Sequence, residues 1–198
     1  WYYGELKRQN GDDTPARIVI GKDTRRSSYM FEYTLVGGLV ASGADAYLLH
    51  VTTTPSVAYV ARTDNFDCGI MISASHNPYY DNGIKCFNHN GEKMEEELLL
   101  EVEKYMDGLT DLDLVTGDHI GEYFEWEDGL EIYMSWLKEC VPVDLSGMKI
   151  LCDLANGSAT STAVETLDSL GATVEAISNS PNGININNKC GSTHPEAL

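Results

Sequence analysis

The feature that most constrains the fold of this chain is an apolar run, Cys68–Ala74, that leads directly into Ser75-His76-Asn77-Pro78. A short, continuous apolar run bounded by turn residues is typical of a strand buried on both faces. Pro78 restricts Asn77 to an extended conformation, so a loop is expected after the strand. In open α/β folds, ligands bind beyond the carboxyl ends of the strands. The sequence therefore predicts a ligand-facing loop that starts at Ser75.

Strand-like and helix-like segments alternate along the chain. Apolar runs typical of strands lie at Arg17–Gly21, Ala46–His50, Cys68–Ala74, Ile84–Phe87, Lys149–Leu154 and Thr173–Ile177. Apolar residues at helical spacing lie in the segments Asp23–Ser42, Thr54–Arg62, Glu92–Met106, Glu122–Cys140 and Ala159–Leu170. Such alternation predicts an α/β fold with parallel-type layers.

A break in this pattern divides the chain. Residues 107–121 are acidic, are interrupted by glycines and have no period, which is typical of a connector. We therefore expect an α/β domain at residues 1–120. Residues 121–198 are predicted to form a linker helix and the first part of a second α/β domain. The final stretch, 181–198, is loop-like and ends on what resembles the start of a helix, so we expect the chain to continue beyond Leu198.

The charge of the chain restricts its partners. The 13 basic and 31 acidic residues give a net charge of -18, which would repel duplex DNA and anionic membranes. We therefore expect no nucleic acid and no membrane as partners. A small anion can still bind where local cations and backbone N–H groups converge.

The cysteines and the N-terminus indicate the compartment. The chain has 5 cysteines, an odd number, and no Cys-x-x-Cys motif, so free thiols are expected instead of disulfides or metal ligands. No apolar run reaches about 18 residues, and the N-terminus does not resemble a signal peptide. The sequence predicts a cytoplasmic protein.

Polar side chains near the predicted loop can act together on a phosphoryl group. A serine hydroxyl such as that of Ser75 needs a base to accept its proton before it becomes a good nucleophile. His76 and Lys85 are candidates for the base, the acid or the neutralising charge, and spacing leaves the choice open. Phosphoryl transfer depends mostly on positioning and charge neutralisation, so a cation beside the hydroxyl is significant. The ordinary alternative is that Ser75 caps a turn, His76 bonds to the backbone and Lys85 is solvated.

Three blocks resemble a known family. The block Ser73–Lys85 (Ser-Ala-Ser-His-Asn-Pro-Tyr-Tyr-Asp-Asn-Gly-Ile-Lys) resembles the phosphoserine loop of the α-D-phosphohexomutase superfamily, and more narrowly its phosphoglucosamine mutase family. Gly21–Ser27 is similar to a Gly-Arg-Asp-Thr-Arg segment of the superfamily, with Lys22 in place of the first arginine. Gly183–Asn187 and Cys190–Glu196 resemble the segment that leads into the family's metal loop. The blocks occur in family order from Ile18 onward.

This resemblance implies a phosphohexomutase-type α/β domain with a mixed sheet between helices, followed by the start of a second, similar domain. It implies that Ser75 is carried as a phosphoserine and passes its phosphoryl group to glucosamine 6-phosphate through a 1,6-bisphosphate, giving glucosamine 1-phosphate. Arg25 would fix the loop electrostatically, and His76 and Lys85 would serve as acid/base and neutralising groups. Mg2+ would bind Ser75 through its phosphate, with the remaining ligands and the substrate-binding residues outside this chain.

Several family segments are not found here. The opening Gly-Thr-Asp-Gly-Ile-Arg-Gly segment, the aspartate-rich metal loop and the sugar-selecting loops do not occur between Trp1 and Leu198, so we expect the isolated piece to have little or no turnover. Phosphoglucomutase or phosphomannomutase activity stays open as an alternative. A non-catalytic phosphate-binding or assembly module is an alternative of another class. A serine hydrolase is disfavoured because no Gly-x-Ser-x-Gly elbow occurs.

Overall fold

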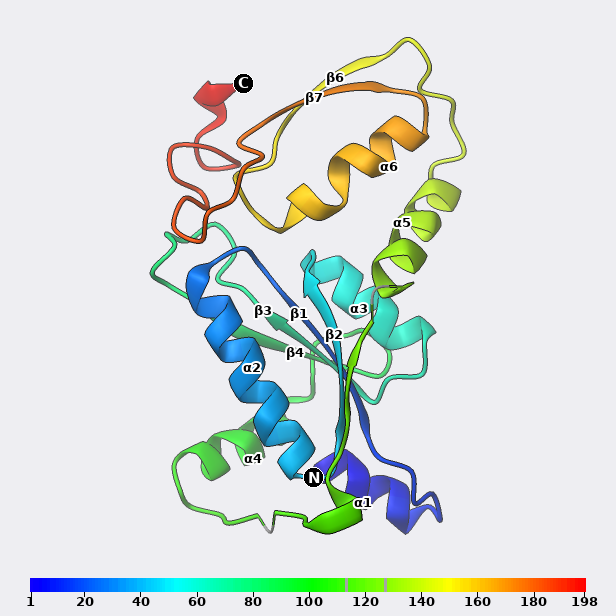
Figure 1. The fold of residues 1–198 in the computed structure, drawn as a ribbon, viewed down its shortest axis with the longest axis vertical. Coiled ribbons are helices and arrows are strands. Elements are labelled where there is room, and N and C mark those ends of the chain that lie inside the picture. Colours follow the sequence, from blue (N-terminus) through cyan, green and yellow to red (C-terminus); the bar gives the residue numbers. More distant parts are fainter. Residues whose placement is uncertain (113, 127) are drawn as a thin grey trace.

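The protein folds into two α/β units, a larger one and a smaller one (Figure 1). A computed structural model describes residues 1–112, 114–126 and 128–198. The larger unit contains α1 (Tyr2–Gln9), β1 (Arg17–Lys22), α2 (Arg26–Ala41), β2 (Asp45–Val51), α3 (Thr54–Thr63), β3 (Cys68–Ile72), β4 (Ile84–Asn88), α4 (Glu96–Met106) and β5 (Tyr123–Glu125). Next come α5 (Asp128–Cys140), then β6 (Lys149–Asp153), α6 (Ala163–Ser169) and β7 (Thr173–Ile177) of the smaller unit. Short 3-10 turns lie at Gly117–His119, Ser158–Ser161 and Pro195–Ala197.

The sheet of the larger unit is mixed, as predicted. Its strand order is β4-β3-β1-β2-β5, and every neighbouring pair is parallel except β3 with β4. The register pairs Lys22 at the end of β1 with Ile72 at the end of β3. The segments that follow these two strands therefore leave the sheet side by side, which brings residues 23–26 next to the loop after β3.

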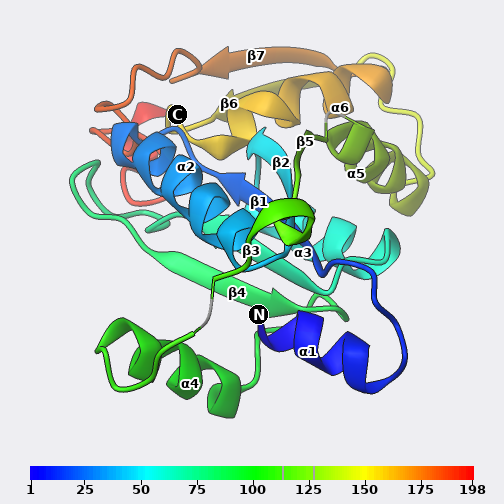
Figure 2. The same ribbon diagram turned by 60° about the horizontal axis from the view of Figure 1, so that its bottom comes forward.

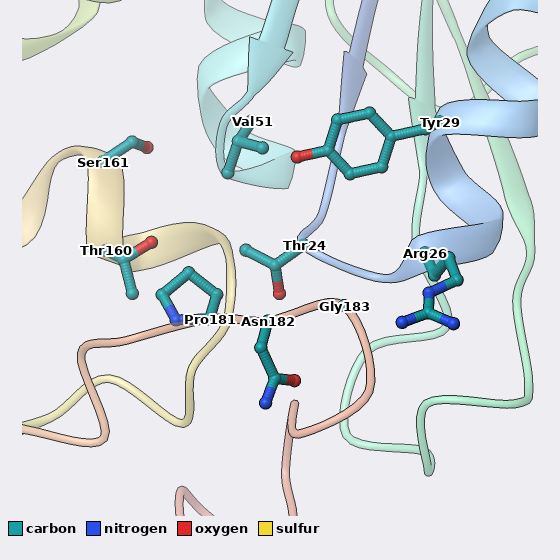
Figure 3. A pocket seen from close by; sticks show the side chains of 9 residues that line it. All are labelled: Thr24, Arg26, Tyr29, Val51, Thr160, Ser161, Pro181, Asn182 and Gly183. Atoms are coloured by element: carbon teal, nitrogen blue, oxygen red, sulfur yellow. The ribbon is translucent and has the colours of Figure 1, made fainter.

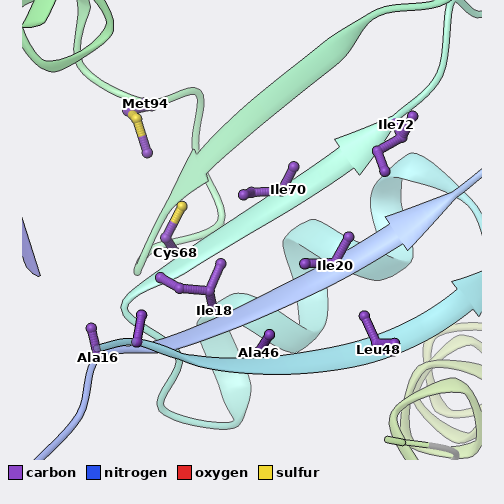
Figure 4. Packing of buried hydrophobic residues seen from close by; sticks show 10 residues of the cluster. Ala16, Ile18, Ile20, Ala46, Leu48, Cys68, Ile70, Ile72 and Met94 are labelled. Carbon is purple, nitrogen blue, oxygen red and sulfur yellow. The ribbon is translucent and has the colours of Figure 1, made fainter. Parts of the chain in front are cut away.

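The central strands β1 and β3 of this sheet are buried on both faces because helices cover each side (Figure 2). Ile18, Ile20 and Ile70 point to one face, where they pack with apolar residues of α2, and Figure 4 shows this cluster. Val19 points to the other face, where α3 supplies Val57 and Val60. Alternate side chains of one strand reach opposite faces, so a continuous apolar run is what such a strand requires.

The region around residue 122 differs from the prediction. The helix expected over Glu122–Cys140 begins at Asp128, and the residues before it form β5, a parallel edge strand on β2. Residue 127, inside the predicted helix, lies outside the described residues. A strand of 3 residues is too short to show a period, and its pairing depends on the free edge of β2. Helix α1 was also not predicted.

The smaller unit confirms the predicted strand–helix–strand cycle. Strands β6 and β7 pair in parallel, with Leu151 opposite Glu175, and α6 connects them. The helix predicted over Ala159–Leu170 is divided into a 3-10 turn and α6, with Thr162 between them. The domain boundary between residues 120 and 121 stays a prediction, and β5, which follows it, is hydrogen bonded to the sheet of the larger unit. No helix among the described residues is both long and apolar enough to cross a bilayer.

Gly21 provides a test of the packing between β1 and α3. A Cβ atom at this position would lie 2.5 Å from Val57 Cγ2 and 2.7 Å from Thr52 Cγ2. We expect Gly21→Ala to lower the free energy of unfolding by about 1–3 kcal/mol, because overpacking forces neighbouring atoms to shift. Urea denaturation measures this loss.

Gly37 on α2 is the matched control. It is exposed, and no atom lies within 4 Å of its added Cβ. Gly37→Ala is expected to raise the free energy of unfolding by up to about 1 kcal/mol, because alanine favours helix. Equal stability of the Gly21→Ala variant and the unaltered protein would contradict the packing described here.

Candidate functional site

The loop after β3, here called the Ser75 loop (residues 73–83), is closed by its own hydrogen bonds. The Ser73 N–H donates to the Gly83 carbonyl at 2.8 Å, and the Ser75 N–H donates to Ser73 Oγ at 3.0 Å. Ser75 has φ of 57°, a left-handed conformation that costs a residue other than glycine about 1–2 kcal/mol. Its side chain is exposed. The surroundings of the loop must therefore hold Ser75 in a conformation that the residue does not itself favour.

Arg25 holds the Ser75 loop from the larger unit. Its side chain is fully buried, and Nη2 donates to the carbonyl oxygens of Ser75 at 3.1 Å and Asn77 at 2.7 Å. The other end of the guanidinium forms a buried ion pair with Asp23. Asp23 also accepts hydrogen bonds from the Arg25 N–H at 3.0 Å and from Ser28 Oγ at 2.8 Å. The structure thus brings Arg25 to the backbone of Ser75.

Lys85 and His76 are placed near the same loop. Lys85 lies on β4 and its Nζ donates to the Ser73 carbonyl at 2.8 Å, while much of its side chain stays exposed. His76 follows Ser75 and is exposed. In the described structure neither side chain is hydrogen bonded to the Ser75 hydroxyl. The catalytic roles of Ser75, His76, Lys85 and Arg25 stay predictions, and so does the choice of proton carrier.

Asn187, which the sequence did not single out, contacts the same carbonyls from the smaller unit. Its Nδ2 donates to the Ser75 carbonyl at 2.9 Å and to the Asn77 carbonyl at 3.0 Å. The residue lies in the Gly183–Asn187 block, which resembles a segment of the family. That resemblance predicted no role for Asn187. A contact between residues so far apart in sequence leaves no local pattern that could have predicted it.

A buried charged cluster lies behind the start of α2. The Lys22 ammonium forms an ion pair with Glu32, lies 3.1 Å from His50 Nδ1 and lies 4.2 Å from the ring centre of Tyr29. Lys22 is 1% exposed and Glu32 is fully buried, so each charge depends on the other for compensation. The pairing fixes the end of β1 immediately before Asp23. Glu32 was not predicted because its partner Lys22 lies on a different element of the chain.

A cleft separates the two units beside the start of α2 (Figure 3). Its volume is about 500 Å³, and it is lined by Thr24, Arg26, Tyr29, Val51, Thr160, Ser161, Pro181, Asn182 and Gly183. Two hydrogen bonds cross between the units next to it. Thr24 Oγ1 donates to the Asn156 carbonyl at 2.6 Å, and the Arg26 N–H donates to the Gly183 carbonyl at 2.9 Å.

Asp153 organises the smaller unit next to Asn187. Its carboxylate accepts the N–H groups of Gly191 at 2.6 Å and Ala155 at 2.9 Å, and the Ala155 carbonyl accepts the Asn187 N–H at 2.9 Å. Burial by itself raises the pKa of Asp153, but the N–H groups of Gly191 and Ala155 stabilise the charged form. The pKa therefore lies below its ordinary value of 3.8.

The described residues do not form a metal site by themselves. No group of three or more His, Cys, Asp or Glu side chains among them is arranged to hold a metal ion. The 5 cysteines are free thiols, of which Cys68 and Cys190 are buried. Burial is the main reason that the pKa of Cys68 lies well above that of an ordinary thiol.

Comparisons with known proteins establish the class. Residues 3–112 match the family model described as phosphoglucomutase/phosphomannomutase, alpha/beta/alpha domain I, and the chain belongs to this family. A phosphoglucosamine mutase from Lachnospira eligens is 56% identical over 199 residues. One from Lachnoclostridium phytofermentans is 52% identical over 199 residues. The predicted resemblance to the N-terminal portion of phosphoglucosamine mutases is confirmed.

The same comparisons define how much of the relatives this chain represents. Each of these two alignments covers 100% of this chain and 43% of the relative. A solved structure of a phosphoglucomutase/phosphomannomutase family protein from Burkholderia thailandensis matches with a TM-score of 0.72 and 22% identity. That match covers 91% of this chain and 39% of the other, and it confirms the predicted fold class.

Replacement of Arg25 tests the buried ion pair. Arg25→Met leaves the Asp23 carboxylate buried without its cation, and breaking such a pair costs about 3–5 kcal/mol. We expect a loss of that size in the free energy of unfolding, measured by urea denaturation. The neighbouring Arg26 is exposed, so Arg26→Ala is the matched control and should change stability by less than about 0.5 kcal/mol. Equal effects of the two substitutions would argue against a structural role for the pair.

Acid titration tests Asp153. Because its pKa is lower in the folded chain than in the unfolded chain, the carboxylate stabilises the fold above the unfolded pKa. This contribution is lost as pH falls through the folded pKa. We expect Asp153→Asn to lower stability by about 1 kcal/mol at pH 7 and the difference to disappear below about pH 3. Melting curves across pH measure it, with the exposed Asp111→Asn as control. A difference that persists in acid would contradict this assignment.

Proposed function

We propose that the protein containing this chain is a phosphoglucosamine mutase that interconverts glucosamine 6-phosphate and glucosamine 1-phosphate, with Ser75 as the phosphoryl carrier. The family membership and the phosphoglucosamine mutase relatives support a phosphohexomutase role. The observation that carries the finer proposal is the geometry of Ser75. Its exposed side chain lies on a loop whose strained backbone is held by donors from both units.

This geometry suits phosphoryl transfer. The protein's main contributions to such a reaction are to position the phosphorus in line with the attacking oxygen and to neutralise charge. A serine on a mobile loop would lose much of the rate enhancement that comes from positioning, because a displacement of about 1 Å lowers the rate by a large factor. The carbonyl contacts from Arg25 and Asn187 restrict the Ser75 backbone and leave the hydroxyl free.

The proposed reaction has two transfers. In the first, the C1 hydroxyl of glucosamine 6-phosphate attacks the phosphorus on Ser75 and gives its proton to a base. The bond from phosphorus to Ser75 Oγ breaks, and Oγ takes up a proton from an acid. The 1,6-bisphosphate then reorients in the site, so that its 6-phosphate faces Ser75. In the second transfer, Ser75 Oγ gives its proton to a base and attacks the 6-phosphate, the bond from phosphorus to O6 breaks, and O6 takes up a proton from an acid. The product is the 1-phosphate, and the phosphoserine is restored.

His76 and Lys85 are the proposed proton carriers, with the choice between them open. Both are exposed: His76 lies within the Ser75 loop, and Lys85 follows the loop on β4 and places an ammonium group beside the Ser73 carbonyl. A cation there would lower the repulsion between an anionic sugar phosphate and a chain with a net charge of -18.

Magnesium is a further part of the proposal. A phosphoryl oxygen on Ser75 would supply one ligand, but the described residues provide no group that completes a site. The remaining ligands and the sugar-binding residues are proposed to lie outside this chain, so residues 1–198 alone should show little or no turnover. We place the protein in the cytoplasm, since the 5 cysteines of residues 1–198 are all free thiols.

Intact-mass measurement tests the role of Ser75. The whole protein, treated with glucosamine 1,6-bisphosphate, is expected to gain one phosphoryl group, and Ser75→Ala should not gain it. Ser135→Ala, an exposed position on α5, is the matched control and should be phosphorylated normally. Uptake by Ser75→Ala, or none by the unaltered protein, would contradict the proposal. Phosphate binding without any covalent uptake would favour the non-catalytic module.

Substrate comparison tests the sugar. The whole protein should turn over glucosamine 6-phosphate with a higher kcat/KM than glucose or mannose 6-phosphate. A preference for glucose or mannose phosphate would replace the proposed activity by that of a phosphoglucomutase or phosphomannomutase.

A further inference from the structure

We infer that Asn187 is a positioning residue for the phosphoryl transfer at Ser75, and that through it the smaller unit controls the geometry of the Ser75 loop. The inference rests on the proposed function of Ser75. It adds a residue from outside the loop and outside the larger unit, and it assigns a role to a side chain whose hydrogen bonds end on the backbone of the loop.

The two carbonyl oxygens of Ser75 and Asn77, together with their donors Arg25 and Asn187, form what we call the carbonyl clamp. Arg25 Nη2 lies 3.1 Å and 2.7 Å from these oxygens, and Asn187 Nδ2 lies 2.9 Å and 3.0 Å from the same two. One donor nitrogen comes from Arg25, the residue directly before α2, and the other from the segment after β7. Each oxygen therefore accepts one hydrogen bond from each unit.

Asn187 is itself held firmly. It has φ of 57°, a conformation that asparagine tolerates better than most residues. Its N–H donates to the Ala155 carbonyl at 2.9 Å, and Ala155 is held by the carboxylate of Asp153. The position of Nδ2 therefore follows the end of β6, which makes the clamp sensitive to the placement of the smaller unit.

Docking of the two units does not by itself require Asn187. The hydrogen bonds from Thr24 to Asn156 and from Arg26 to Gly183 already join them beside the cleft. The contacts of Asn187 differ because both end on the Ser75 loop, on either side of His76. A side chain used only for docking would have no need to converge on the carbonyls that Arg25 already binds.

The consequence concerns catalysis more than binding. With Arg25 alone, the loop is attached to the larger unit, and the strained Ser75 backbone has one donor fewer to hold it. Loss of about two neutral hydrogen bonds should increase loop motion and lower the rate of transfer by about tenfold. The affinity for a sugar phosphate should change little, because the Asn187 side-chain amide is engaged with the backbone of the Ser75 loop.

Two variants of the whole protein separate this role from folding. Asn187→Gly removes the side chain and keeps the left-handed backbone accessible. Asn187→Asp keeps the shape and replaces the donor by a carboxylate that faces two carbonyl oxygens. Asn188→Gly is the matched control, since Asn188 is adjacent and exposed. Melting curves identify any variant that fails to fold, and Asn187→Gly keeps the test valid if Asn187→Asp does not fold.

Amide hydrogen exchange and steady-state kinetics are then measured together. In Asn187→Gly we expect faster exchange across residues 73–83, a kcat lowered by about tenfold and a KM within about twofold of the unaltered protein. Asn187→Asp should lose more, and Asn188→Gly should match the unaltered protein. If Ser75 is phosphorylated but Asn187→Gly leaves both exchange and kcat unchanged, this inference is overturned and the proposed function stands. A rise in KM alone would also overturn it. Failure of the unaltered protein to phosphorylate Ser75 would overturn both.

Discussion

The buried ion pair between Asp23 and Arg25 is the interaction on which the site depends. It lies where β1 ends and α2 begins, a point set by the pairing of β1 with β3. Asp23 holds the guanidinium and the Ser28 hydroxyl, and the guanidinium holds two carbonyls of the Ser75 loop. Two charges inside a protein are tolerated only when each compensates the other. The pair therefore joins strand, helix and loop in one geometry.

The second constraint is that donors from both units bind the backbone of the Ser75 loop. Its sequence follows β3, but its backbone conformation depends on a donor from the larger unit and a donor from the segment after β7. Because the donors bind the same two carbonyls, movement of either unit changes the position of Ser75. In an acidic chain with 13 basic residues, the exposed Lys85 supplies positive charge beside this loop, whereas the charge of the buried Arg25 is compensated by Asp23.

Much of the fold was predictable from local patterns. Continuous apolar runs identified β1 and β3 because a strand covered on both faces has no polar side, and helical spacing identified α2 and α3. The edge strand β5 was missed, since its 3 residues pair with β2 only after the chain has returned to that edge. Glu32 was missed for a related reason. Nothing within its own helix shows that Lys22, on a neighbouring strand, compensates its charge.

The sequence by itself determined the α/β class and the family, and it predicted the residues proposed to act on the phosphoryl group, because these are encoded in contiguous blocks. Ser75 and His76 share one such block with Lys85, and Arg25 lies in another. Only the tertiary structure decided how the Ser75 loop is held. The left-handed conformation of Ser75 and the convergence of Arg25 and Asn187 on its carbonyl depend on backbone atoms, which every residue carries alike. Backbone contacts between distant segments leave no signature in side-chain identity, so they emerge only when the chain is folded.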